Sequence, residues 1–474
     1  MRAARLAAFA AAAFCAGCGL FPQAYERPAV DVPKDWRVAA PMDKSLADTD
    51  WAVAFQSPQL RALIAEALAN NSDLRIAVER VELARAQYGI QRSEMFPSLA
   101  ANAAATRSRL PSASGSNVVT ESSSAVLTVP SWEIDLWGRL ASLSESARRS
   151  YLASEQNRRA VQVSLVAEVA IAYIQLVGLD EQVAISVRTL ESRHKSLAIV
   201  TSRYKAGITS VLDVRQAEIL VAGAQAVLAQ QQLQRSQVEN ALSILVGSNP
   251  RVIARSASMT AYDLPPELPA GLPSALIDRR PDLLAAEENM RAADLNVDAA
   301  RKAFLPAISI TGFLGYASPA MKALTSSDRY AWSVEPAISL PIFTWGALTS
   351  SLEATEAQQR IALELYRAAI RNAFREVDDA LAAYQSQREQ RVALGASVKA
   401  NRERLRLTDL RYVNGVASFF EVLDSQRNLF EAELDYVRAT QATYGAVVQL
   451  YRALGGGWSA PAAPASPQVS SRPD

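Results

Sequence analysis

The chain has one histidine, His194, and only two cysteines, and its 49 basic residues are almost balanced by 48 acidic ones. A single histidine excludes a histidine-rich metal site and leaves no Ser-His-Asp triad away from His194. Walker, nucleophile-elbow, zinc-spacing and dinucleotide-binding sequences are also missing, so we expect no enzyme, no metal and no cofactor. Because there is no basic tract, nucleic acid is not an expected partner.

Long apolar runs are scarce as well. The run Leu6–Phe14 is too short to cross a bilayer, and the arginines before it make it typical of a secretory signal over residues 1–17. Beyond it we find no run of about 18 consecutive apolar residues. Ala16-Gly17-Cys18 resembles the lipobox of bacterial lipoproteins, whose cysteine is acylated, although Cys15 stands where that motif usually has leucine. Cys18 is the predicted lipidation site; the alternative is an ordinary signal peptide with two incidental cysteines.

The chain does contain a duplication. The segment Arg203–Val214 recurs as Arg411–Val422, 208 positions later, and Trp137-Gly138 recurs as Trp345-Gly346 at the same spacing. Two copies in register indicate a duplicated architecture rather than a solenoid of many repeats. We expect each Trp-Gly pair at a strand-to-helix corner, where the ring fills the bend; the alternative is that these rings are interfacial aromatics.

Two long blocks, residues 131–249 and 342–460, hold none of the 22 prolines. Because proline breaks helix interiors, each block predicts nearly continuous helix. Gly207 and Gly415 are suited to the left-handed conformation that ends many helices, so each block should turn back on itself there. The sequence therefore predicts helical hairpins over residues 139–247 and 347–455.

Residues 96–136 and 304–343 have a different composition, with β-branched and aromatic residues among prolines, glycines and serines. Each segment predicts two strands joined by a polar loop. Four strands cannot close a barrel within one chain, and open sheet edges are not tolerated in lipid, so a membrane role would need strands from other subunits. The strands alone are equally typical of a soluble α+β protein, and the helices are typical of a soluble coiled-coil scaffold too.

Four segments carry a family resemblance: Tyr25–Val30, Arg279–Leu283, Arg411–Arg427 and Leu454–Trp458. Together they resemble the outer membrane factor family, the TolC/OprM-like channel-tunnels, and specifically the lipoprotein branch of RND efflux channel-tunnels. The resemblance implies a mainly α fold with a transmembrane β-barrel portion, built from duplicated strand-strand-long-helical-hairpin units. It also implies a homotrimer, in which four strands per chain form a twelve-stranded barrel joined to a periplasmic α-helical barrel.

The resemblance also suggests a division of the chain. The expected parts are a lipoprotein signal peptide (1–17), an N-terminal equatorial and anchor segment (18–56), a first repeat (57–247), an equatorial linker (248–275), a second repeat (276–457) and a disordered tail (458–474).

The function implied by the resemblance is an outer-membrane exit channel of a tripartite RND-type efflux system. Such a channel is a passive conduit for drugs or other small amphiphiles from periplasm to outside, lipid-anchored in the outer membrane and extending into the periplasm. The implied partners are a periplasmic adaptor (membrane fusion) protein, an inner-membrane RND pump and outer-membrane lipid. Type I secretion or metal-ion efflux is the alternative use of the same channel.

The resemblance places a periplasmic gate at the hairpin ends. Glu421 and Asp424 are three residues apart and so share one helix face, where a three-fold assembly would turn each into an acidic ring that attracts cations. The alternative for both carboxylates is a favourable interaction with the positive end of the helix dipole.

Four further residues belong to the implied gate. Asp213 and Tyr412 would lie where hydrogen bonds and salt links hold neighbouring hairpins together in the closed state, and Phe420 would form an apolar constriction. Arg427 would pair with Asp424 of a neighbouring chain. Where some family members have a gate arginine this chain has Ala417, so the latch must differ, using Arg411 or Arg427.

Overall fold

The computed structural model describes residues 26–55, 57–111, 117–256, 268–319, 321–324 and 326–456. Cys18, the predicted signal peptide and the predicted tail 458–474 lie outside these residues. So does part of the predicted linker, residues 257–267.

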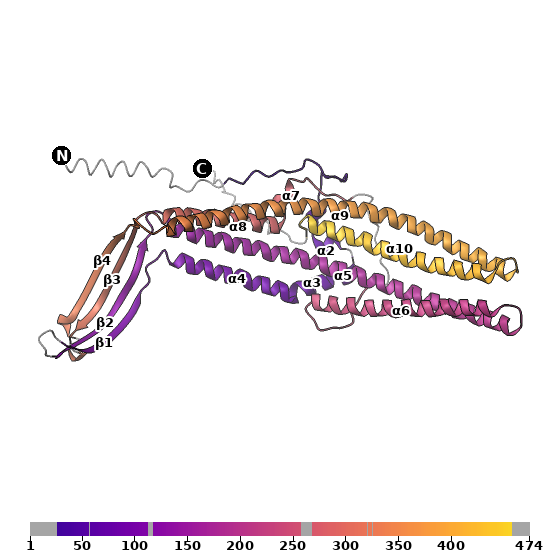
Figure 1. The fold of residues 1–474 in the computed structure, drawn as a ribbon, viewed down its shortest axis with the longest axis horizontal. Helices are drawn as coiled ribbons and strands as arrows, with labels where there is room; N and C mark the ends of the chain where they lie inside the picture. The colour runs from indigo at the N-terminus through magenta and orange to yellow at the C-terminus, as the bar shows by residue number, and fades with distance from the viewer. Residues whose placement is uncertain are drawn as a thin grey trace, which may run out of the picture. The chain divides into compact units, whose positions relative to one another are not determined.

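In both halves of the chain shorter helices are followed by two strands and then by two long helices, and most residues are helical (Figure 1). The first half contains the helices α2 (Trp51–Ala54), α3 (Pro58–Asn70) and α4 (Ser72–Ser93), the strands β1 (Ala100–Pro111) and β2 (Asn117–Ile134), and the long helices α5 (Arg139–Lys205) and α6 (Val211–Leu245). The second half contains α7 (Ala275–Arg279), α8 (Pro281–Lys302), β3 (Ala307–Ser318), β4 (Tyr330–Ser339), α9 (Ala347–Val413) and α10 (Phe419–Ala453). Three short 3-10 turns, Leu46–Asp48, Met321–Ala323 and Ser327–Arg329, complete the described elements.

This order confirms the predicted fold class of duplicated strand-strand-hairpin units. The structure adds helices before each strand pair that the sequence reasoning did not identify: α2, α3 and α4 before β1, and α7 and α8 before β3. The helices α4 and α8, which come directly before the strands, correspond to each other. Both have 22 residues, and α8 starts at Pro281, where a proline is tolerated because the first helical N–H has no partner within the helix. The helices α5 and α9 have 67 residues each, so each is about 100 Å long.

One expectation about apolar runs is corrected. The helix α5 contains an 18-residue window with a mean hydropathy of 1.8, so by length and composition it is apolar enough to cross a membrane. Half of that window is buried within the protein. Leu165, Val169, Tyr173 and Leu176 of α5 belong to a hydrophobic core shared with α3, α6 and α10, which explains the local hydropathy.

The four strands form one antiparallel sheet in the order β1-β2-β3-β4, so β1 and β4 lie at its edges. The central pair, β2 and β3, joins the two halves of the chain, from Ser123 opposite Ser318 to Ile134 opposite Ile308, with a bulge between Val129 and Trp132.

The register of the sheet separates apolar from polar side chains, because directly paired residues in neighbouring strands lie on the same face. One face carries Leu127, Leu314, Trp332, Val334 and Ile338, which expose from 44% (Leu127) to 73% (Ile338) of their surface. The other face carries Asn102, Thr128, Ser309, Ser333 and Glu335. Towards the β1–β2 connection the apolar face becomes charged, and Arg107 pairs there with Glu121 at 3.0 Å. The sheet is therefore amphipathic, with large apolar side chains left uncovered.

The two Trp-Gly corners differ from each other. Gly138 and Gly346 have φ angles of +74° and +85°, so both bends use a conformation that favours glycine. The Trp137 indole donates a hydrogen bond of 2.8 Å to the carbonyl of Pro306 and so lies in its corner. Trp345 is 89% exposed beside Phe343, so the corner-filling prediction is wrong for this ring.

The chain divides into two compact units. One consists of the described residues up to Val30, Glu79–Glu155 and Ala285–Ala368, and contains the sheet. The other consists of Asp31–Val78, Gln156–Leu284 and the described residues from Ala369 onward, and contains the hairpin ends. Each unit takes elements from both halves of the duplication, so the compact units cut across the predicted repeats 57–247 and 276–457.

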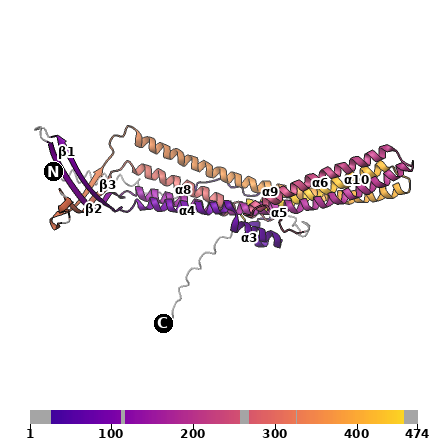
Figure 2. The same cartoon turned by 90° about the horizontal axis from the view of Figure 1, so that it is seen from below.

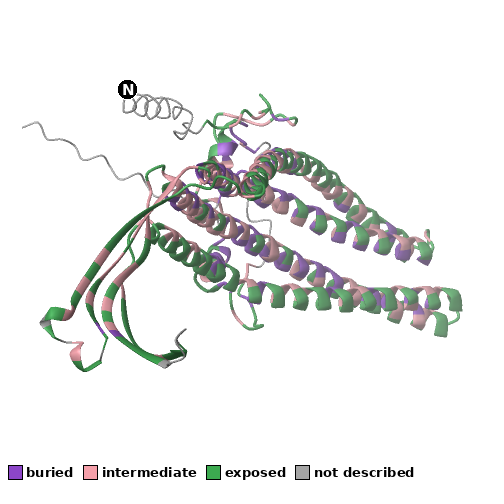
Figure 3. Ribbon diagram, turned by 60° about the vertical axis from the view of Figure 1, so that its left-hand side comes forward, coloured by how far each residue is buried: buried purple, intermediate pink, exposed green. Residues whose placement is uncertain are grey.

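Buried positions form a stripe along the long helices (Figure 3). On α9 they include Ile370, Ala373, Val377, Ala380 and Tyr384, which are three or four residues apart. This spacing is typical of helices that pack side by side with the remaining faces in water.

Candidate functional site at the hairpin ends

The free ends of both hairpins lie in the same compact unit, where α5 and α6 run beside α9 and α10 (Figures 1 and 2). At the first turn Gly207 has a φ angle of +72°, and the N–H of Ile208 donates to the carbonyl of Arg203 at 2.9 Å. At the second turn Gly415 has a φ angle of +76°, and the N–H of Val416 donates to Arg411 in the same way. Both turns therefore end a helix by the same glycine-based hydrogen bonding.

The second helix of each hairpin begins with a capping box. The Ser210 hydroxyl accepts from the N–H of Asp213, whose carboxylate accepts from the N–H of Ser210 at 3.3 Å. Ser418 and Glu421 repeat this arrangement, with a distance of 3.1 Å from the Ser418 nitrogen to the carboxylate. The hydrogen bond from the Ser418 N–H keeps the pKa of Glu421 below its usual value. Asp213 and Glu421 thus act as helix caps, as the helix-dipole alternative for Glu421 implied.

Asp424 has a different environment. Its carboxylate lies 2.6 Å from Arg404 on α9 and 2.7 Å from Arg427, and it accepts a third hydrogen bond of 3.0 Å from Asn428. Within its own chain Arg427 already contacts Asp424, because residues three positions apart on a helix are neighbours. Its pairing with Asp424 of a neighbouring chain stays a prediction. The sequence reasoning missed Arg404.

We refer to the free ends of the two hairpins, with their turns at Gly207 and Gly415, as the tip. Some aromatic residues of the tip belong to the core and others lie on the surface. Phe419 is buried, and its ring centre is 5.4 Å from that of Tyr412. The guanidinium carbon of Arg203 lies 4.8 Å from the centre of the Tyr412 ring. Phe420 is 60% exposed and lines a cavity of about 150 Å³ between α6 and α10, together with Ile219 and Leu220. Phe420 is thus available to a constriction, whereas Phe419 is part of the core.

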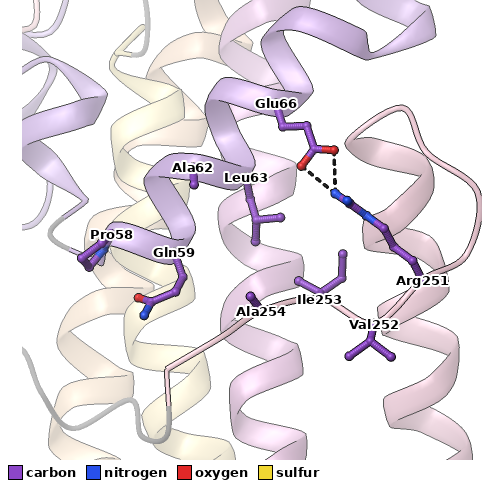
Figure 4. Close-up of a pocket in the computed structure, with 9 residues that line it drawn as sticks. All are labelled: Pro58, Gln59, Ala62, Leu63, Glu66, Arg251, Val252, Ile253 and Ala254. Carbon is purple, nitrogen blue, oxygen red and sulfur yellow. Dashed lines mark hydrogen bonds and ion pairs between the residues drawn. The ribbon is translucent and has the colours of Figure 1, made fainter.

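A larger cavity, of about 430 Å³, lies between α3 and the segment that follows α6 (Figure 4). Its side chains are mostly apolar, and at one edge Arg251 is held by the Glu66 carboxylate at 2.6 Å. Ile253 is buried beside Leu63. The sequence reasoning singled out none of these residues. The Arg251–Glu66 salt bridge and the packing of Ile253 against Leu63 hold the segment after α6 against α3.

Within the described ranges, no group of three or more histidine, cysteine, aspartate or glutamate side chains is arranged to hold a metal ion. The predicted tip residues therefore offer charges, hydrogen bonds and aromatic rings.

The chain thus combines an amphipathic sheet with two long helical hairpins, and comparison with known proteins identifies its family. The family model described as outer membrane efflux protein matches residues 63–248 and 272–456. The outer membrane protein OprJ of Pseudomonas aeruginosa is 40% identical over 448 residues, 93% of each chain. The probable efflux pump outer membrane protein TtgC of Pseudomonas putida is 38% identical over 464 residues, 96% of each chain.

Solved structures agree with these matches. A membrane protein from Pseudomonas aeruginosa has a TM-score of 0.86 at 39% identity, and covers 92% of this chain and 97% of its own. The open state of the MtrE outer membrane channel of Neisseria gonorrhoeae has a TM-score of 0.84 at 35% identity, with 92% and 98% covered. The chain therefore belongs to the outer membrane efflux protein family and is an outer-membrane exit channel of an efflux system.

Proposed function

We propose that the chain forms a homotrimeric, passive conduit that completes a tripartite RND-type efflux system. The observation that carries this proposal is the uncovered apolar face of the sheet. Leu127, Leu314 and Trp332 form a row across three strands on that face, and all three are exposed. An exposed apolar face of this kind is suited to contact with lipid, whereas the opposite face, with its serines and threonines, is suited to a water-filled lumen. The edges β1 and β4 would pair between chains and close twelve strands into a barrel, which removes every open edge.

The proposed partners are a periplasmic adaptor protein and an inner-membrane RND pump, which supplies the energy. Among the relatives, one is named a toluene efflux pump outer membrane protein and another an antibiotic efflux pump outer membrane protein. We accordingly propose drugs or other small amphiphiles as the cargo, with no chemical step on the cargo.

Lipid anchoring at Cys18 is part of the proposal. The described chain is already held a few residues later, because Arg27 forms a salt bridge of 2.8 Å with Glu287, whose side chain is almost fully buried. A lipid on Cys18 would therefore lie nine residues before Arg27, which is bound to α8. Replacing Cys18 by alanine should abolish labelling by radioactive palmitate, and labelling of the variant equal to that of the natural chain would exclude this cysteine.

We further propose that the hairpin ends form the periplasmic gate, with Asp213, Tyr412, Phe420, Glu421, Asp424 and Arg427 around the constriction. Its support is the position of these residues at the free ends of both hairpins. Asp424 has two arginine partners, so its proposed ring carries less free negative charge than a bare carboxylate ring.

Single-channel recording in a planar lipid bilayer tests both the channel function and the role of Asp424 in the gate. The purified full chain should give discrete conductance steps, and a chain without steps would contradict the channel function. The Asp424→Ala variant should change the conductance and its block by polyvalent cations. If both stay as in the natural chain, Asp424 does not belong to the gate.

A further inference from the structure

Arg203 links the two hairpins at their ends. It lies in the last turn of α5, with its guanidinium carbon 4.8 Å from the centre of the Tyr412 ring near the end of α9. Tyr412 packs in turn on Phe419, the first residue of α10. Phe419 belongs to a buried cluster that also contains Val200 of α5 and Val214 of α6. The Tyr412 ring is thus fixed by the core of the tip and contacted by a cation of the other hairpin.

The carboxylates of the tip have partners other than Arg203. Glu421 caps α10 and lies 3.6 Å from Arg411, and Asp424 is bound by two arginines. Asp213 caps α6 and accepts a hydrogen bond from Thr209. A guanidinium over a tyrosine ring gains from the negative face of the ring, and this attraction is weaker at an exposed site than at a buried one. Arg203 and Tyr412 are both half-buried, so the attraction between them lies between these two limits.

We propose that Arg203, stacked on Tyr412, is the gate latch of this chain and supplies the cation that Ala417 does not. This inference rests on the proposed channel function. A gate that opens when the two hairpin ends of a chain move apart must separate the Arg203 side chain from the Tyr412 ring. The latch is then an arginine of the first hairpin and a ring of the second.

A second arginine of α5, Arg193, also lies near an aromatic ring, but it is buried and has a hydrogen-bond partner on another helix. Arg193 is only 4% exposed, lies 5.0 Å from the centre of the Phe430 ring and donates 2.7 Å to the carbonyl of Leu220. It is ten residues before Arg203, about 15 Å along the helix. Because Arg193 is buried and joins three helices, we infer that the hairpins stay together there while the contact of Arg203 opens.

The first experiment compares Arg203→Gln with Lys205→Gln in planar bilayers. Lys205 is exposed in the same last turn of α5, so its variant removes the same charge without touching the ring. Loss of this cation–π contact should raise the ratio of open to closed channel about 2- to 5-fold per chain, and about 10- to 100-fold for three chains. Lys205→Gln should leave the ratio within about twofold of the natural chain, and Arg203→Lys should restore most of the closed state.

The second experiment separates the ring of Tyr412 from its hydroxyl. A latch made by the ring predicts that Tyr412→Phe stays closed and Tyr412→Leu opens as much as Arg203→Gln. The double variant with Tyr412→Leu and Arg203→Gln should open no further than either single variant, because both remove one contact.

The outcomes are distinct. Opening in Tyr412→Phe would overturn the ring latch in favour of a hydroxyl hydrogen bond. An unchanged or more closed Arg203→Gln channel, with normal trimer yield, would also overturn it. Absence of conductance steps in the natural chain would instead contradict the channel function on which the latch rests.

Discussion

A charge on the apolar face of the sheet should prevent assembly in lipid, whereas the same charge one residue earlier should not. Val334 lies in the middle of β4, is 61% exposed and belongs to the apolar face. Ser333 belongs to the opposite face, which already carries Glu335. A lysine facing the bilayer centre costs about 2–4 kcal/mol in a β-barrel, so Val334→Lys should cost about 6–12 kcal/mol in a trimer. That cost is comparable with the whole stability of many proteins.

The assay is refolding of each variant into lipid vesicles, followed by electrophoresis without heating to separate trimer from monomer. Val334→Lys should yield little trimer, and the matched Ser333→Lys variant should assemble and conduct like the natural chain. The reasoning is refuted if Val334→Lys assembles normally, or if Ser333→Lys fails to the same degree, because then the register does not identify a lipid-facing side.

Three further predictions concern the helical part. Replacing Arg280 by alanine should destabilise the chain by about 1–3 kcal/mol, because its buried side chain loses a 2.8 Å salt bridge to Glu376 and a 3.0 Å hydrogen bond to the carbonyl of Ala453; thermal unfolding measures this. Gly247→Ala should lower the melting temperature by the equivalent of about 1–3 kcal/mol, since its φ is +77° and the new Cβ would lie 2.5 Å from the carbonyl oxygen of Asn70. Lowering the pH through the depressed pKa of Glu421 should protonate this carboxylate, so its stabilising effect is present near neutral pH and lost in acid. Hydrogen-exchange protection in the first turns of α10, corrected for the intrinsic exchange rate at each pH, should fall in acid in the natural chain and stay constant in a Glu421→Gln chain.

The fold class could be predicted because proline and glycine act locally. A proline-free block must be compatible with helix at each position, and a glycine such as Gly207 or Gly415 allows a left-handed turn whatever lies nearby. The helices α2, α3, α4, α7 and α8 escaped prediction because they lie outside the two long proline-free blocks. Pairing of β2 with β3 was also beyond local reasoning, since strands about 180 residues apart give no local signal of their register.

Which tip residues contact each other depends on the rotation of each helix about its own axis. This rotation is set by the buried residues along the whole length of the hairpin, because they must face the neighbouring helices. The spacing of Glu421 and Asp424 was enough to predict that they share one helix face, because that prediction involves a single helix. That Arg404 of α9 reaches Asp424 required the register between two antiparallel helices. The same holds for Arg203 and Tyr412, whose contact joins different hairpins.

This difference changes the expected electrostatics of the tip. Two carboxylates considered alone predict an acidic ring that attracts cations. The structure places three arginines on these two carboxylates: Arg411 on Glu421, and Arg404 with Arg427 on Asp424. Two negative and three positive charges sum to +1 for this group in each chain. Within one chain these carboxylates are partners of arginines, so we expect the ion preference of the proposed gate to depend on those arginines as much as on the acidic side chains.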